Sequence, residues 1–572
     1  MPETVQKEMS MELRLLLAFL LMGAVMFLMP YLVKSPAPAA GKKNSPPAAA
    51  IVEKKPQAEA VSSAPATPAK AATASEAAAP AAPATSEQAL PPLTIDNGVF
   101  KVTFSNQGGT VRDWVLNNFK QNDNKQPLNL VNTAANTDPP FSLYFPTEKP
   151  AVNVNRAYYK QTPDADGLGV VYEFSDGHTD VRKTFRFQKN IYRLQVSSEV
   201  SIDGRPVPSM IQWRGGFGDM SVSGPAAHNT AVYFNVADDK LVEQNAKTAK
   251  NGPVTSTGDY SFAGMVDQYF AAVFLPEDSH QLTSVTFSDE AHTTFEEKPQ
   301  PFAGTAVSDG ATNRFSVFVG PKDVDLLRRI NPKLENLVNF GWWAPIAKPL
   351  FLILKWAAGW IHNFGWAVVV VTIFLNLLMF PLRLTSMKSA RKMQALKPQL
   401  DVIAEKYKNL SIRDPRKQQQ QQEQMELYKK YGINPLGGCL PSLLPLALVW
   451  PFYRVIYAAA EMRGTHWLWV SDLSQPEHLP IKILPIAMIV TQFLMQKMMP
   501  SPGVDPNQQK MMLFMPLIFG FMFYNLPSGL VLYYLTGTVV AIAQQWFFNH
   551  TEAAQAAARS VQPPPKKKNG RK

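Results

Sequence analysis

Apolar residues form one isolated stretch near the N-terminus and five further stretches between His362 and His550. The first, Leu13 to Val33, is about twenty residues long, enough to cross a hydrocarbon core of about 30 Å as a helix. This pattern predicts a transmembrane anchor over residues 1–34 and a helical membrane core over residues 362–550. A cleaved signal peptide is the alternative for the first stretch. The five later spans are expected at about 362–382, 440–460, 481–499, 511–526 and 529–549.

A different periodicity begins near Leu93. Phe100, Val102 and Phe104 alternate with polar residues, which is typical of half-buried strands. Similar alternation and frequent glycine-containing turns continue for more than two hundred residues, so we expect one all-β sandwich domain over residues 93–325. The preceding segment, residues 35–92, is rich in Ala and Pro and has few large apolar residues. It is predicted to be a disordered tether.

Two helices are expected between the β-domain and the membrane core, within residues 326–361. Leu326 to Leu337 suits a short connecting helix. Residues 345–360 place Trp and Lys on one face, which suits the headgroup region of a membrane and favours an interfacial helix. A sixth membrane crossing is the alternative for this second helix.

A helical hairpin is predicted over residues 383–433, between the first two core spans. One arm has an apolar seam at steps of three and four residues, and the other begins at Asp414-Pro415 and offers Met425 and Tyr428. Pro398 either kinks the first arm or marks its beginning. The seam residues are Met393, Leu396, Leu400, Ile403, Tyr407 and Leu410.

Charge predicts the orientation of these segments. The formal net charge is +11, and basic residues are concentrated beside the apolar spans. The hairpin holds about twelve Lys or Arg against five acids, and the tail, residues 551–572, is also basic, so both are expected in the cytoplasm. Counting spans then places the β-domain outside and the N-terminus in the cytoplasm. Membrane proximity explains the positive charge better than specific DNA binding does.

Several kinds of chemistry have no sequence support. Cys439 is the single cysteine, and the eight histidines form no HExxH pattern or other paired ligand spacing. A GxxxxGK[ST] phosphate loop is also absent from the sequence. We therefore expect no metal, no cofactor and no enzymatic activity.

The apolar spans contain polar residues that a simple membrane anchor would avoid. Polar groups in hydrocarbon cost free energy unless they find a partner or water, so their presence on neighbouring spans predicts a hydrated recess inside the bilayer. They are Thr372, Asn376, Arg454, Gln492, Gln496, Gln544 and Gln545.

The core closely resembles the YidC family of bacterial inner-membrane protein insertases. The matching strings include NPLGGC at 434–439, WVSDLS at 469–474, FMP at 514–516 and PSGLVLYY at 527–534. The anchor, tether and β-domain that precede the core are similar to the Gram-negative form of the family. The resemblance implies a multi-domain fold: a periplasmic all-β supersandwich, a five-span α-helical insertase core, an N-terminal anchor and a cytoplasmic hairpin.

The resemblance also implies an activity. Such a protein takes nascent membrane proteins from the ribosome, alone or with the Sec translocon, inserts them through a hydrophilic groove in the inner membrane, and assists their folding. Thr372, Tyr533 and Tyr534 match groove or substrate-contact positions of the family. Asn376 stands where the family commonly has an arginine, so a charge-based attraction at that position is not expected here.

One hypothesis is that Arg454, on the second core span, supplies the missing positive charge. The alternative is that this side chain reaches back to the outer interface. Arg383 is a weaker candidate, because a position at the cytoplasmic boundary already accounts for it.

Two other functions are compatible with parts of the pattern. Polar intramembrane residues also suit a solute channel or transporter with a periplasmic binding domain, although no internal repeat is found. A sensor would need an output motif, and none is recognised. The lysines of the tail could contact ribosomal RNA or anionic lipid; they are Lys566, Lys567 and Lys568.

Overall fold

The computed structural model describes most of the chain from Gln88 to Thr551. The described ranges are 88–121, 126–132, 137–222, 229–277, 281–291, 300–310, 312–407, 416–433, 435–498, 506–551 and 555–556. Five predictions lie outside them: the anchor over residues 1–34, most of the tether over 35–92, Leu410 of the hairpin seam, the helix start at Asp414-Pro415, and the basic tail with Lys566, Lys567 and Lys568.

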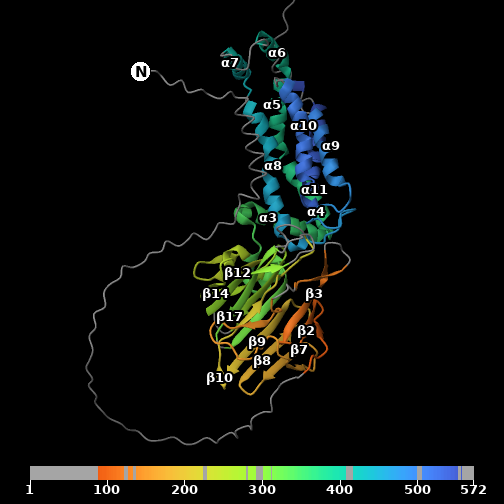
Figure 1. The fold of residues 1–572 in the computed structure, drawn as a ribbon. Coiled ribbons are helices and arrows are strands. Elements are labelled where there is room, and N and C mark those ends of the chain that lie inside the picture. The colour runs from red at the N-terminus through yellow and green to blue at the C-terminus, as the bar shows by residue number, and fades with distance from the viewer. Residues whose placement is uncertain are drawn as a thin grey trace, which may run out of the picture. The chain divides into compact units, whose positions relative to one another are not determined.

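The β-domain consists of two antiparallel sheets, as the alternating pattern predicts (Figure 1). The smaller sheet has the order β1-β2-β3-β4, with β1 Leu93–Asp96, β2 Phe100–Ser105, β3 Thr110–Lys120 and β4 Pro127–Asn129. Phe100, Val102 and Phe104 all point into the core from β2. The pleat of the strand therefore separates these apolar residues from the polar ones between them.

The larger sheet has fourteen strands in the order β5-β11-β17-β16-β14-β15-β18-β9-β8-β7-β6, with β10 paired to β9 and β12 paired to β13 and β14. Its strands are β5 Ser142–Tyr144, β6 Lys160–Pro163, β7 Gly169–Ser175, β8 Thr179–Phe187, β9 Arg193–Ile202, β10 Arg205–Pro206, β11 Met210–Trp213, β12 Thr230–Asn235, β13 Lys240–Gln244, β14 Val254–Val266, β15 Phe270–Pro276, β16 Gln281–Ala291, β17 Gln300–Ser308 and β18 Asn313–Pro321. A short 3-10 helix, η2 Ala246–Ala249, follows β13.

Aromatic rings fill the core of the β-domain. Trp114 lies 4.9 Å from Phe100 and 6.2 Å from Trp213, measured between ring centroids. Lys183 is among the charged side chains buried in this domain: its ammonium donates hydrogen bonds to the main-chain carbonyls of Gly108, at 2.7 Å, and Phe141, at 2.8 Å. Both acceptors are main-chain oxygens, so a lysine here ties two loops to strand β8.

The predicted connecting helix over 326–337 is divided into two parts. Helix α2, Val324–Ile330, is followed by the 3-10 helix η3, Pro332–Leu337. Asn331 separates them, and its side chain accepts a hydrogen bond from the Lys333 amide at the start of η3. Proline at position 332 has no N–H to continue the ladder of α2, which explains the interruption.

A single helix, α3, occupies Ala344–Ile361 after the 3-10 turn η4 Gly341–Trp343. Ala347, Phe351 and Leu354 form its buried face, whereas Trp356 and Trp360 are exposed. The predicted helix over 345–360 is therefore present and two-faced. Its length and apolar composition would also allow it to cross a membrane, so the interfacial and spanning interpretations both stay open.

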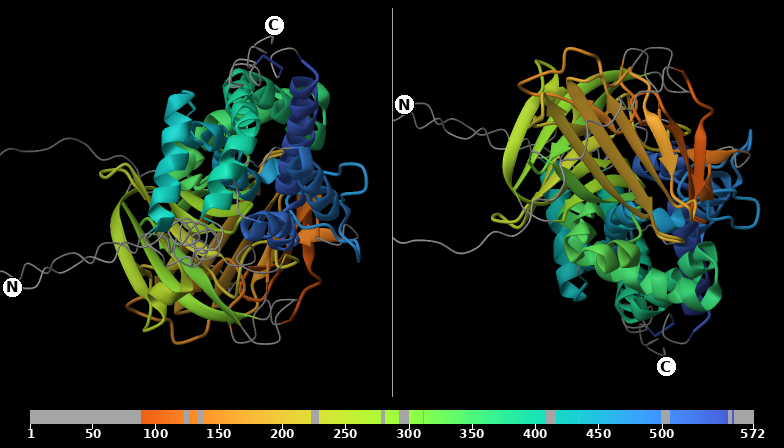
Figure 2. Two further views of the ribbon diagram at one scale, coloured as in Figure 1. Left: turned by 90° about the horizontal axis from the view of Figure 1, so that it is seen from above. Right: turned by 90° about the horizontal axis from the view of Figure 1, so that it is seen from below.

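Several helices of the predicted membrane core lie within the described residues (Figure 1). They are α4 Phe364–Leu378, α5 Phe380–Ala395, α8 Pro435–Ala458, α9 Ile483–Met498, α10 Pro506–Phe523 and α11 Ser528–Asn549; η5 Ala460–Met462 follows α8. Helix α11 packs against α4, α5, α8 and α9, and Figure 2 shows the bundle nearly end on.

The first core span differs from the prediction because it bends. Helices α4 and α5 meet at Met379 with a change of direction of 58°. Pro381 lies in the first turn of α5 and cannot donate a hydrogen bond back to α4, which accounts for the break. Within the described residues, Gly341–Ile361 and Ser528–Asn549 each have the length and composition of a membrane span, and the bent pair could form a third. The five-span count thus stays a prediction.

The hairpin is present as a contact between α6, Lys397–Lys406, and α7, Arg416–Lys430. Leu396 and Leu400 are buried against Ile433 and Tyr428, and Lys406 pairs with Glu423 at 2.6 Å. Pro398 lies in the first turn of α6 and so marks the beginning of that arm. The prediction for Met425 was wrong: this side chain is exposed, and Leu427 and Tyr431 accompany Tyr428 in the contact.

Candidate functional site

Four polar residues of α4, α5 and α11 are connected by hydrogen bonds inside the helical bundle. The Gln544 side-chain amide donates to the main-chain carbonyl of Asn376 at 3.1 Å, and the Asn376 side-chain amide donates to the main-chain carbonyl of Thr372 at 2.8 Å. Arg383 donates to the other side of the Gln544 amide, Oε1, at 2.9 Å. We call Thr372, Asn376, Arg383 and Gln544 the polar row.

Close approach of two helices builds this row. Gly537 on α11 faces α4, and a Cβ atom at this position would lie 3.6 Å from Asn376 Nδ2 and 3.8 Å from Thr372 Cγ2. Thr372 is fully buried, and its hydroxyl oxygen has no hydrogen-bond partner among the described residues. The row therefore places two amides, a hydroxyl and a guanidinium group within a largely apolar bundle.

The predicted tyrosines lie on the same helix as Gln544, closer to its N-terminal end. Tyr533 is buried, and its ring stacks on Phe452 of α8 with centroids 4.1 Å apart. Tyr534 is half-buried, with its ring centroid 5.3 Å from that of Phe523 on α10. These contacts join α11 to two neighbouring helices by aromatic packing.

The predicted glutamines of α9 are one helical turn apart. Gln492 and Gln496 are both half-buried, on a helix that packs along α11 and α10. The predicted Gln545 of α11 is buried and donates to Asn549 Oδ1 at 3.0 Å. The structure thus brings Thr372, Asn376 and Gln544 into one bonded group, with the α9 glutamines on an adjoining helix.

Arg454 is not part of this group. Its guanidinium donates to the carbonyl of Asn339 at 2.6 Å and to that of Phe340 at 3.4 Å, just before α3, and lies over the Tyr457 ring. Asn376 and Arg454 therefore have no common partner among the described residues, and the compensation hypothesis stays a prediction. The contacts agree with the alternative that this arginine reaches back to the end of its helix.

A second polar cluster lies outside the helices, in the loop that joins α8 to α9. Arg463 is only 3% exposed on its side chain and pairs with Asp219 of the β-domain and Asp472 of the same loop, each at 2.5 Å. The loop also accepts hydrogen bonds from the start of α11, because the amides of Ser528 and Gly529 donate to the carbonyls of Gln475 and Leu473, both at 2.8 Å. Sequence reasoning missed this cluster, although Asp472 lies within a motif that the family resemblance singled out.

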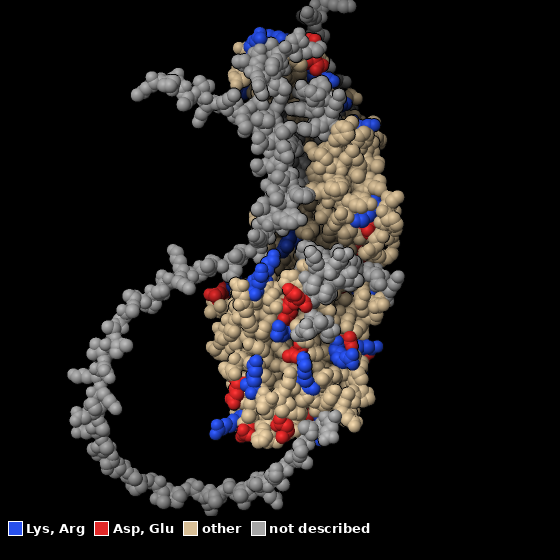
Figure 3. Space-filling model, viewed as in Figure 1, with Lys and Arg blue, Asp and Glu red and all other residues tan. Residues whose placement is uncertain are grey.

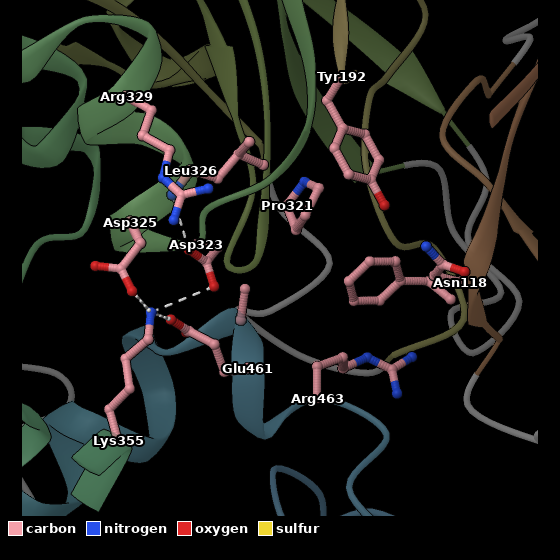
Figure 4. A pocket seen from close by; sticks show the side chains of 12 residues that line it. Asn118, Tyr192, Pro321, Asp323, Asp325, Leu326, Arg329, Lys355, Glu461 and Arg463 are labelled. Carbon is pink, nitrogen blue, oxygen red and sulfur yellow. Dashed lines mark hydrogen bonds and ion pairs between the residues drawn. The ribbon is translucent and has the colours of Figure 1, made fainter. Parts of the chain in front are cut away.

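A pocket of about 600 Å³ opens beside this cluster, between the β-domain, α2 and α3 (Figure 4). Three carboxylates converge on Lys355 there: Asp325 and Glu461 at 2.9 Å and Asp323 at 3.4 Å. Burial, together with the neighbouring Asp323, raises the pKa of Glu461 to about 7. Lys355 pairs with one oxygen of each acid, whereas Glu461 Oε2 has no hydrogen-bond partner among the described residues. The pocket is therefore a charged junction between three segments of chain.

Metal binding finds no support within the described ranges, where no group of three or more His, Cys, Asp or Glu side chains is arranged to hold an ion. The charge distribution also separates the two domains. On the face in Figure 3, charged residues are spread over the β-domain, whereas the described surface of the helical bundle carries few charged residues.

Comparison with known proteins accounts for both domains. Residues 92–353 match the family model described as the YidC periplasmic domain, and residues 356–555 match the model described as 60Kd inner membrane protein. A membrane protein insertase YidC of Syntrophus aciditrophicus is 32% identical over 475 residues, which cover 80% of this chain and 84% of the relative. One from Wolinella succinogenes is 41% identical over 303 residues, or 53% of each chain.

Solved structures give a weaker match. The structure of an active YidC insertase with its first transmembrane domain resolved is 19% identical, with a TM-score of 0.36, over 80% of this chain and 93% of that one. The curated relatives named above are membrane protein insertases, so the transporter alternative receives no support from them. With two adjacent family models and a relative that aligns over most of both lengths, this chain belongs to the YidC family of membrane protein insertases.

Proposed function

We propose that this insertase passes the apolar segments of newly made inner-membrane proteins along a hydrophilic groove formed around the polar row. The observation that carries this mechanism is the bonded connection from Thr372 and Asn376 through Gln544 to Arg383. Amide and guanidinium groups at membrane depth cost free energy, and such groups usually have a functional role. They are therefore candidates for contact with a client.

Such a groove would lower the cost of moving the polar atoms of the client into the membrane. A segment that enters a bilayer must carry polar loop atoms past hydrocarbon, at a cost of several kcal/mol for each unpaired group. The side chains of the polar row can replace part of the lost water for those atoms. The groove therefore lowers the barrier to insertion without nucleotide hydrolysis.

Apolar side chains on the neighbouring helices suit release into lipid. Large hydrophobic residues are exposed on three helices of the core, as expected where hydrocarbon chains or client helices contact them. They include Phe374, Leu377 and Leu378 on α4, Val490 and Leu494 on α9, and Leu517, Ile518 and Phe521 on α10.

The orientation that we propose follows the charges. The basic hairpin 383–433 and both termini face the cytoplasm, where nascent chains leave the ribosome, and the β-domain lies in the periplasm. The ribosome, the Sec translocon and anionic lipids are then the partners, and the lysines of the tail contribute to electrostatic attraction. The chain assists the folding of its clients but carries out no chemical step on them.

Photocross-linking tests the groove. A photoreactive residue at Gln492, in place of the native side chain, should cross-link to a ribosome-stalled membrane protein whose apolar segment has just emerged. The same residue at the exposed Val402 of the hairpin provides a matched position outside the groove. Equal cross-linking at both positions, or none at Gln492 while depletion of the protein still blocks insertion, would contradict the groove.

A further inference from the structure

We propose that the carboxyl groups of Glu461 and Asp323, which we call the acid pair, share one proton and make the contact between the α8–α9 loop and the end of the β-domain sensitive to pH. With the proton bound, the loop stays closed against α2 and α3. When the proton is lost, this contact opens more readily. The inference concerns the junction of the two domains and does not depend on the proposed groove.

Three segments that are far apart in sequence meet at the acid pair (Figure 4). Asp323 lies at the start of α2, Lys355 is on α3, and Glu461 is in η5 of the α8–α9 loop. The Lys355 ammonium lies 2.9 Å from Glu461 Oε1 and 3.4 Å from Asp323 Oδ2. Asp325 also pairs with this lysine, but its side chain is 53% exposed. A change of charge on the acid pair therefore acts on a contact between all three segments.

Glu461 is poorly placed to carry a negative charge. Its side chain is only 11% exposed, and its Oε2 atom has no hydrogen-bond partner among the described residues. A buried carboxylate oxygen without a donor costs free energy, and this cost falls when the carboxyl group is neutral. Burial, together with the neighbouring Asp323, raises the pKa of Glu461 to about 7. Near neutral pH the folded chain therefore holds a proton on Glu461 for part of the time.

Asp323 is better placed to stay ionised. Its carboxylate caps α2, where it accepts a hydrogen bond from the Leu326 amide at 2.9 Å. Burial raises the pKa of Asp323, but the hydrogen bond from Leu326, the charge of Lys355 and a hydrogen bond from Glu461 outweigh burial and hold this pKa below its ordinary value. The protonated carboxyl of Glu461 can thus donate to the carboxylate of Asp323. Opposite shifts in two neighbouring acids favour one shared proton.

The other charged or titratable residues that line the described pocket do not replace this proton. Arg463 is already paired with Asp219 and Asp472. Arg329 of α2 is exposed to solvent, where its charge is screened. Burial raises the pKa of Tyr192, so this side chain stays uncharged near neutral pH. Loss of the shared proton therefore leaves three carboxylates around the single ammonium of the pocket.

The direction of the pH effect follows from the number of protons bound. In the closed contact Glu461 holds its proton up to about pH 7, whereas in water it would release the proton near pH 4.5. The closed contact therefore binds more protons between these two values, and the equilibrium constant for opening rises with pH by at most about tenfold per unit. The stabilisation is fully present near pH 4.5 and is lost as the pH rises through about 7. Asp323 acts in the opposite sense only at lower pH, because its pKa is lowered.

Hydrogen exchange of the full chain in phosphatidylcholine nanodiscs tests this inference. A lipid without net charge avoids a surface potential that would alter the local pH. Protection of residues 324–330 and 460–475, corrected for the intrinsic exchange rate, should fall by about tenfold from pH 5.5 to pH 7.5. Glu461→Gln keeps a neutral donor beside Asp323 and should show high protection at both pH values. Glu290→Gln, at an exposed position of β16, should behave like the wild type.

A substitution of the second acid separates titration from structure. Asp323→Asn keeps a good helix cap but removes the negative charge beside Glu461, so the fall in protection should move to lower pH. Protection that stays constant in the wild type between pH 5.5 and pH 7.5 would overturn the inference. Full pH dependence in Glu461→Gln would also overturn it.

Histidines of the same loop are the competing pH-sensitive groups, because histidine commonly changes charge near neutral pH. His466 and His478 are both exposed, and replacing both by Gln should leave the pH dependence intact. If this double variant loses the pH dependence while Glu461→Gln keeps it, the histidines are responsible and the assignment to the acid pair is wrong. Insertion is not measured in this experiment, so neither result bears on the proposed groove.

Discussion

Lys183 is a charged side chain that the β-domain accommodates in its interior. Its side chain is 2% exposed, it binds the carbonyls of Gly108 and Phe141, and burial lowers its pKa to about 7. Lys183→Met should therefore reduce the free energy of unfolding of the β-domain by about 2 kcal/mol, because two carbonyls lose their donor. Pulse proteolysis of the detergent-solubilised chain in urea measures this change. Replacing the exposed Lys160 by Met should change it by less than about 0.5 kcal/mol.

The lowered pKa of Lys183 also predicts a pH dependence. Between pH 7 and about 10, the unfolded chain holds a proton on this lysine that the folded chain has largely released, so unfolding takes up a proton. The free energy of unfolding should then rise with pH in this window, by at most about 1.4 kcal/mol per pH unit. The difference between wild type and Lys183→Met at pH 7, 8 and 9 measures the effect. A difference that stays constant or shrinks as pH rises would contradict the assignment.

The hairpin shows how a few apolar contacts order a pair of helices. Leu400 of α6 is 1% exposed and packs with Leu396, Ile433 and Tyr428. Leu400→Ala should destabilise the contact by about 2–3 kcal/mol, through lost burial and the cavity left behind. Hydrogen exchange of residues 416–430 in the full chain should accelerate accordingly. Val402→Ala is the control, because Val402 is on the same helix and 71% exposed, and unchanged exchange is expected there.

Sequence periodicity was most successful for elements whose partners are close in the chain. The alternation at Phe100, Val102 and Phe104 predicted a strand with those residues buried, and the seam at Leu396 and Leu400 predicted the first arm of the hairpin. The second arm was less accurate. With only two apolar positions proposed on α7, the pattern could not define which face turns inward, and Met425 is exposed.

The sequence pointed to polar residues of the candidate site but not to the hydrogen bonds between them. Polar residues in apolar spans drew attention to Thr372, Asn376 and Gln544, since the cost of burying them does not depend on knowing the fold. The bond between Arg383 and Gln544 joins residues 161 positions apart and depends on the bend at Met379. A short stretch of sequence contains no information about such a pairing. From the sequence alone, a position at the cytoplasmic boundary was therefore enough to explain Arg383.

Arg463 links parts of the molecule that are far apart in sequence, because it joins the β-domain to the α8–α9 loop. It lies between Asp219 and Asp472, and all three side chains are almost fully buried. Arg463→Met would leave two buried carboxylates without their counter-charge and should cost about 3–5 kcal/mol of stability. Thermal unfolding of the solubilised chain, monitored through the protease sensitivity of the loop, measures this loss.

A double-mutant cycle tests whether Asp219 and Arg463 stabilise the chain as a pair or whether each substitution impairs folding independently. Asp219→Asn and Arg463→Met should be strongly non-additive, because either change alone removes the same pair. Arg205→Met, at an exposed position of β10, should be nearly neutral and additive with both. Additive effects of the first two substitutions would show that the β-domain and the loop are stabilised independently.

The hydrogen bonds from Ser528 and Gly529 to the α8–α9 loop restrict how α11 can move. One end of this helix is fixed to the loop by main-chain bonds, whereas its other end is held by side-chain contacts, those of Gln544 with α4 and α5 and of Phe548 with Met387. Helix α11 has 22 residues and is about 33 Å long, so a swing of about 10° about the fixed end would carry Asn549 through about 6 Å. Gln544 lies near the far end and Tyr533 near the pivot. Room for an incoming client would therefore open first beside the polar row, while the aromatic contacts near the pivot hold.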